Sequence, residues 1–198
     1  MLEFDVRRSG DGVLVAHHDE RLGDGRLLCD VTAADVAGSD PNQPGPPQLK
    51  DLMGVVARHT SVLLDLKEDG IEEEALAVTL AAVPEDDVLV TTLSWRQVAV
   101  VKAVRPRVRT GLSVNRSLTA YLRGLGHARH AGADLLAINH LYLRTPLARA
   151  ALSAGLPLYV WTVDSDRLLE RVVQDPRIAC VITNRPLRAQ ALSRDASR

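Results

Sequence analysis

The sequence of 198 residues predicts an α/β fold built around a parallel β-sheet. Short runs rich in β-branched residues alternate with longer segments whose apolar residues recur with the period of a helix. The connections between these segments are short and contain glycine or proline, which is typical of turns. Both an open, doubly wound sheet and a closed barrel agree with these observations.

Eight segments are predicted to be strands: Leu2–Val6, Val13–Ala16, Val62–Leu66, Val88–Thr92, Val108–Leu112, Leu135–Ile138, Leu158–Val163 and Ala179–Thr183. Seven segments are predicted to be helices: Leu49–His59, Ile71–Val83, Trp95–Val104, Leu118–Ala131, Thr145–Ala154, Ser165–Gln174 and Pro186–Leu192. The second strand follows the first across the turn Ser9-Gly10-Asp11-Gly12, which predicts an antiparallel hairpin. The other seven strands are expected to be parallel.

The number of strand–helix units favours a barrel with one unit missing. A (β/α)₈ barrel has eight parallel strands and about 250 residues, and this sequence opens directly in a strand. We therefore expect a TIM (β/α)₈ barrel lacking its first β/α element, in a single domain over residues 1–198. Residues 30–47 are expected to form an irregular loop, and residues 193–198 a frayed tail. The missing strand would leave two barrel edges unpaired, and three explanations are open. The natural chain starts further upstream, which we favour, or a partner chain covers the edge, as in a homo-oligomer, or the sequence is a degraded gene product.

Composition and charge argue against several classes of partner. The formal net charge is −1 and aromatic residues make up 3%, so neither a basic surface nor stacking platforms for nucleic acid are expected. Cys29 and Cys180 show no disulfide or zinc spacing. The sequence shows no signal pattern and no apolar run near the ~20 residues that span a bilayer. We expect a cytoplasmic protein without stable membrane insertion.

Two carboxylates share one face of the first predicted strand. Glu3 and Asp5 are two residues apart, so strand alternation points them to the same side. Such a pair is repulsive unless a cation lies between its members. A divalent-cation site and a solvent-facing edge strand are both open interpretations.

A second acidic position lies in the apolar strand Val62–Leu66. Asp65 and Lys67 are two residues apart and therefore lie on one face, either as a structural ion pair or as part of a site. In a parallel barrel the strand ends carry the active site, so these residues are expected to meet Glu3 and Asp5 at one rim. Three oxygen donors without histidine or thiolate favour a hard ion, Mg²⁺ or Ca²⁺.

The dipeptide His17-His18 follows the short strand Val13–Ala16. A histidine at a strand end beside a divalent cation is suited to general acid/base catalysis near neutral pH, although surface histidines are common. By strand alternation, His17 and His18 are expected to face opposite sides.

These motifs together resemble the glycerophosphodiester phosphodiesterase family. The resemblance is carried by seven segments in family order: Glu3-Phe4-Asp5-Val6, Asp11-Gly12-Val13-Leu14-Val15, His18-Asp19, Pro47-Gln48-Leu49, Leu64-Asp65-Leu66-Lys67, Val160-Trp161-Thr162-Val163 and Val181-Ile182-Thr183-Asn184-Arg185-Pro186. It implies a barrel of the phospholipase C-like phosphodiesterase type and metal-dependent hydrolysis of glycerophosphodiesters to glycerol 3-phosphate and an alcohol. It also implies roles for individual residues: Glu3, Asp5 and Asp65 as metal ligands, His18 as an acid/base group, Lys67 as a phosphate contact and Trp161 as a pocket wall near the alcohol.

The sequence departs from the family pattern at three places. Asp65 stands where the family usually has glutamate, and Asn184 replaces a common aspartate. The family's first-strand His-Arg-Gly motif, which carries the second acid/base histidine, has no match. We therefore expect impaired activity; the alternatives are an inactive phosphodiester-binding pseudoenzyme or gene fragment of the same fold, and a lipid-directed phospholipase.

Overall fold

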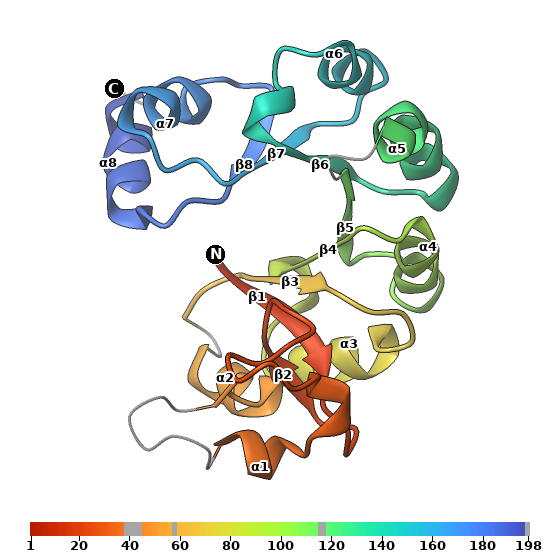
Figure 1. Cartoon of the computed structure of the whole chain (residues 1–198). Helices are drawn as coiled ribbons and strands as arrows, with labels where there is room; N and C mark the ends of the chain where they lie inside the picture. Colours follow the sequence, from red (N-terminus) through yellow and green to blue (C-terminus); the bar gives the residue numbers. More distant parts are fainter. Residues whose placement is uncertain (38–44, 57–58, 115–117, 197–198) are drawn as a thin grey trace. The chain divides into compact units, whose positions relative to one another are not determined.

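The computed structural model in Figure 1 describes residues 1–37, 45–56, 59–114 and 118–196. The chain divides into two compact units, Met1–Thr110 and Gly111–Arg198. Strands and helices alternate through both units, as the sequence predicts. None of the helices in the described ranges is long and apolar enough to cross a lipid bilayer.

The first unit is built on four strands: β1 (Leu2–Arg8), β2 (Leu14–Ala16), β3 (Val62–Leu66) and β4 (Val88–Thr92). Their order is β2-β1-β3-β4, with β1 antiparallel to β2 and parallel to β3, and β3 parallel to β4. The predicted hairpin is thereby confirmed. Its helices are α1 (Ala33–Ala37), α2 (Leu49–Val56), α3 (Glu72–Leu80) and α4 (Trp95–Val104), with 3₁₀ turns at Leu28–Asp30 and Glu85–Asp87.

The apolar core of this unit holds in place the strands that carry the acidic residues. Leu63 and Leu64 point to opposite faces of β3 and are both almost fully buried, because the strand is covered on both sides. Burial of each such side chain stabilises the fold by about 1.5–3 kcal/mol. The register places Asp5 beside Asp65, and Asp65 beside Thr91. Since paired residues of neighbouring strands point to the same face of a sheet, this register brings the polar residues of three strands together.

The second unit contains four parallel strands in the order of the chain: β5 (Arg109–Val114), β6 (Leu135–Asn139), β7 (Leu158–Trp161) and β8 (Ile178–Val181). Its helices are α5 (Leu118–Ala131), α6 (Pro146–Ser153), α7 (Asp166–Val173) and α8 (Pro186–Ala196), with a 3₁₀ turn at His140–Tyr142. Leu136, Ile138 and Leu158 are fully buried between sheet and helices. The strand order of each unit agrees with the predicted α/β fold, and the missing first β/α element stays a prediction.

Two segments differ from the irregular structure expected for them. The expected loop at residues 30–47 contains helix α1, whose first turn is capped by Thr32 Oγ1, which accepts the N–H of Asp35 at 3.0 Å, and by Asp11, which accepts the N–H of Ala33 at 3.1 Å. Val36 on this helix is also buried against Val15 in a small apolar cluster. Residues 38–44 of that expected loop lie outside the described part. Helix α8 continues to Ala196, so the tail predicted to fray from residue 193 is helical up to that point.

Candidate active site

Three carboxylates meet on one face of the two neighbouring strands β1 and β3. Glu3 and Asp5 come from β1 and Asp65 comes from β3, and each offers an oxygen within 4.8 Å of the oxygens of the other two. The alternation of β1 and the pairing of Asp5 with Asp65 bring them together. The expectation that these residues converge is borne out by this geometry, although their role as ligands stays a prediction.

The electrostatics of the cluster reflect crowded negative charge. Burial, together with the charges of Asp5 and Asp65, raises the pKa of Glu3 from 4.5 to about 7. Burial also raises the pKa of Asp65, although the nearby Lys67 ammonium opposes this shift. A cation between the three carboxylates would remove this repulsion, and an all-oxygen set favours a hard ion.

Lys67 supplies a positive charge to two of these carboxylates. Its Nζ lies 2.8 Å from Oδ1 of Asp5 and 2.5 Å from Oδ2 of Asp65, and the three side chains are 15%, 22% and 21% exposed. Desolvation opposes the charge on Lys67, but the two carboxylates outweigh it and raise the pKa of the amine. Thr91 donates its hydroxyl to Asp65 Oδ1 at 3.1 Å. With all three carboxylates ionised, the cluster keeps two net negative charges.

The two adjacent histidines have different surroundings. We expected strand alternation to point the two side chains to opposite sides. Strand β2 ends at Ala16, however, so alternation does not determine their directions. The backbone N–H of His17 donates a hydrogen bond to the carbonyl oxygen of Asp5 at 2.9 Å. Its ring Nε2 lies 3.1 Å from the carbonyl oxygen of Arg21. The His18 side chain is 70% exposed, and its Nδ1 lies 2.8 Å from Oδ1 of Asp19. This hydrogen bond lowers the pKa of Asp19.

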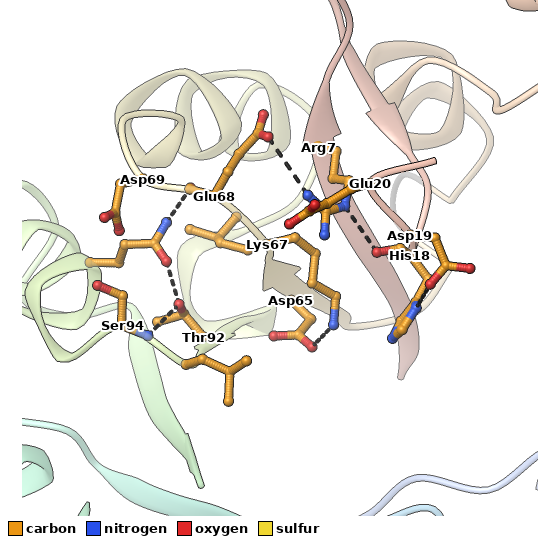
Figure 2. A pocket seen from close by; sticks show the side chains of 13 residues that line it. Arg7, His18, Asp19, Glu20, Asp65, Lys67, Glu68, Asp69, Thr92 and Ser94 are labelled. Carbon is orange, nitrogen blue, oxygen red and sulfur yellow. Dashed lines mark hydrogen bonds and ion pairs between the residues drawn. The ribbon is translucent and has the colours of Figure 1, made fainter. Parts of the chain in front are cut away.

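Asp65, Lys67 and His18 border one open cavity of about 650 Å³, shown in Figure 2. The side chains that line it come from β1, the segment after β2, the ends of β3 and β4, the connections that follow these two strands, and the start of α4. They are Arg7, His18, Asp19, Glu20, Asp65, Leu66, Lys67, Glu68, Asp69, Thr92, Leu93, Ser94 and Gln97. Thus one predicted ligand, the predicted phosphate contact and the predicted acid/base residue share a cavity.

Sequence reasoning missed several polar residues at this cavity, among them Arg7, Glu68, Gln97 and Thr92. Arg7 continues the face of Glu3 and Asp5, and this i, i+2, i+4 spacing was the signal that could have found it. Glu68 follows Lys67 directly, and Gln97, which is 2% exposed, donates to the Glu68 carbonyl at 2.5 Å. Thr92 in turn donates its hydroxyl to Gln97.

Trp161 lies in the second unit, where it is the last residue of β7 and pairs with Asn139 of β6. Its side chain is partly buried. The predicted role of Trp161 as a wall near the alcohol stays a prediction.

Comparisons with known proteins agree with this fold. Curated proteins gave no match. Among solved structures, a phosphodiesterase from Oleispira antarctica in complex with its product sn-glycerol-3-phosphate has a TM-score of 0.79 at 22% identity, covering 96% of this chain and 83% of that one. A glycerophosphodiester phosphodiesterase from Parabacteroides distasonis gives 0.76 at 18% identity, covering 99% and 84%. Another from Agrobacterium tumefaciens gives 0.73 at 20% identity, covering 96% and 85%.

These similarities establish the fold, and the sequence itself establishes the family. Residues 1–188 match the Glycerophosphoryl diester phosphodiesterase family. The matched range includes the three carboxylates, Lys67, His18 and Trp161. The chain therefore belongs to the glycerophosphoryl diester phosphodiesterase family, whose members are phosphoric diester hydrolases.

Proposed function

We propose that this protein hydrolyses glycerophosphodiesters to glycerol 3-phosphate and an alcohol with the help of a divalent cation. The observation that carries the proposal is the cluster of three carboxylates within 4.8 Å of one another. One of these carboxylates, Asp65, also lines the cavity that holds Lys67 and His18. Membership of the family supports the choice of substrate, as does the product bound to the Oleispira antarctica relative.

The donor set fits a hard divalent ion. Glu3, Asp5 and Asp65 would hold it, since carboxylate oxygens are the ligands that Mg²⁺ and Ca²⁺ prefer. Aspartate is one methylene shorter than the glutamate usual in the family. A carboxylate oxygen of Asp65 nevertheless lies within 4.8 Å of carboxylate oxygens of Glu3 and Asp5. When bound, such an ion supplies positive charge that orients and neutralises the phosphodiester.

Lys67 is proposed to contact the phosphate. An ammonium group has three N–H donors, and the structure directs two of them to Asp5 and Asp65. The third donor is then available for a phosphate oxygen on the cavity side, where a charge-assisted hydrogen bond is roughly twice as strong as a neutral one.

His18 is proposed as the general acid. As the P–O bond to the departing alcohol breaks, the imidazolium gives its proton to that oxygen and water adds to phosphorus. The proton that this water loses passes to solvent, which reprotonates the imidazole, and glycerol 3-phosphate is released. Such proton transfer typically contributes ~10²–10⁴ in rate. Among the described residues, His18 is the one histidine that lines the cavity, so slow turnover is expected without a second imidazole.

The proposal is tested with purified protein and glycerophosphocholine. Glycerol 3-phosphate is measured by coupled oxidation, in separate reactions with Mg²⁺, Ca²⁺ and a chelator. Release of glycerol 3-phosphate that requires one of the ions supports the proposal. Ion-dependent thermal stabilisation without any product would instead indicate a phosphodiester-binding pseudoenzyme.

A further inference from the structure

The position of the His18 ring depends on its backbone and on one side-chain contact, that of Nδ1 with Oδ1 of Asp19 at 2.8 Å, and the Asp19 side chain is itself 75% exposed. The His18 side chain is exposed, and strand β2 ends two residues earlier, so no sheet hydrogen bond holds His18 itself. The preceding residue is anchored by the His17 N–H to Asp5 O bond of 2.9 Å. The next anchor is Nε of Arg7, which donates to the His18 carbonyl at 2.9 Å.

Arg7 is itself held in a restricted position. Its side chain is 12% exposed, and its Nη1 lies 3.9 Å from Oε2 of Glu68 (Figure 2). Glu68 is fixed in turn because its Oε1 accepts the backbone N–H of Arg8 at 2.5 Å and its carbonyl accepts from Gln97 at 2.5 Å. A continuous set of contacts therefore runs from α4 through Glu68 and Arg7 to the backbone of His18.

We infer that Arg7 is a positioning residue for His18, with Glu68 holding the guanidinium in place; this rests on the proposed role of His18 in hydrolysis. The planar guanidinium engages the His18 carbonyl through Nε and faces Glu68 through Nη1. A lysine has the same charge but a single ammonium, which cannot reproduce this two-sided geometry. Direct binding of the phosphate by Arg7 is the competing role, and it would depend mainly on charge.

The test compares Arg7→Lys with Arg8→Lys and His18→Ala. Arg8 is a matched control because its side chain points to Glu74 and Gly70, at 2.9 and 3.2 Å, and does not line the cavity. Two substrates are used, glycerophosphocholine and glycerol 3-phosphate p-nitrophenyl ester, whose leaving group needs little protonation. Glu68→Gln is the second variant, should Arg7→Lys fold poorly.

On glycerophosphocholine, Arg7→Lys should lower kcat about tenfold and change KM less than about twofold. The loss of kcat in Arg7→Lys should differ between the two substrates in the same way as the loss in His18→Ala. The double variant, Arg7→Lys with His18→Ala, should be no slower than His18→Ala alone. Arg8→Lys should match the parent. A rise in KM alone, full activity of Arg7→Lys, or additive losses in the double variant would overturn the inference.

A second measurement does not depend on turnover. If the parent releases no glycerol 3-phosphate, the proposed function fails, and the positioning role is judged from ¹H–¹⁵N correlations of the histidine rings. Arg7→Lys and Glu68→Gln should shift the ring signals of His18 and leave those of His17 in place, with His18→Ala providing the assignment. Unchanged His18 ring signals in both variants would refute the positioning role.

Discussion

Replacement of Glu3 by glutamine should stabilise the protein in the absence of divalent ions, although it removes a proposed ligand. The pKa of Glu3 is raised from 4.5 to about 7, so its carboxylate binds a proton more tightly in the folded than in the unfolded chain. The stability linked to this proton is fully present below pH 4.5 and is lost as the pH rises to about 7. Glutamine resembles the protonated form and should keep that stability at every pH.

The size of the effect follows from the pKa shift. A shift of one unit corresponds to about 1.4 kcal/mol, but Glu3 is only partly buried, and screening by solvent reduces the value. We therefore expect a gain of about 1–2 kcal/mol at pH 8 and almost none at pH 4.5. For a chain of this length, this corresponds to a rise in Tm of roughly 2–8 °C.

Thermal unfolding at both pH values, in chelator and in Mg²⁺ or Ca²⁺, provides the assay. In chelator at pH 8, Glu3→Gln should melt above the parent, and added ion should raise the Tm of the parent much more than that of the variant. Glu170→Gln, at an exposed position on α7, is the matched control and should change neither value. A Tm of Glu3→Gln at or below the parent's in chelator at pH 8 would refute the repulsion argument. An equal response to the ion would refute the ligand assignment.

Three further predictions concern the carboxylate cluster, Lys67 and the adjacent histidines. The rise in Tm caused by Mg²⁺ or Ca²⁺ should grow between pH 5.5 and 8, because below pH 7 the ion must displace the Glu3 proton; a rise that is independent of pH would contradict this. Lys67→Met should destabilise the ion-free protein by about 1–3 kcal/mol in urea unfolding, since it leaves Asp5 and Asp65 without their counter-charge, and added ion should narrow the difference. His18→Ala should lower kcat on glycerophosphocholine by about 100-fold or more, whereas His17→Ala should stay within about threefold; equal losses would show that His18 has no special role.

Much of the fold was predictable because its signals are local. The apolar runs of β3 and β4 were assigned with correct bounds, since strands buried on both faces read as continuous β-branched and leucine segments. Helix α1 was missed although its start has a local signal: Thr32 Oγ1 accepts the backbone N–H of Asp35 at 3.0 Å and donates to Asp35 Oδ2 at 2.7 Å, as in a capping box. Five residues are too few for an apolar period to show, and the further bond from Ala33 N–H to Asp11 joins residues 22 positions apart.

The site was predictable where the facing and pairing of strands determine the position of a side chain. The facing of Glu3 and Asp5 follows from alternation, and the pairing of Asp5 with Asp65 follows from parallel strands. Two features were not accessible in this way. Lys67 was expected at the same rim as Asp5 and Asp65, but the direct ion pair between its Nζ and Asp5 depends on side-chain reach across strands. Likewise, the contact of Arg7 with the His18 carbonyl depends on where the chain turns after β2.

The most direct test of the carboxylate cluster is anomalous diffraction from crystals soaked in Mn²⁺, a hard ion that accepts the same oxygen ligands. We predict one strong peak with oxygens of Glu3, Asp5 and Asp65 within about 2.6 Å of it, and loss of that peak in Asp5→Asn. A peak bound elsewhere, or none at this cluster while Lys67 still bridges Asp5 and Asp65, would contradict the assignment of these three carboxylates as the metal site.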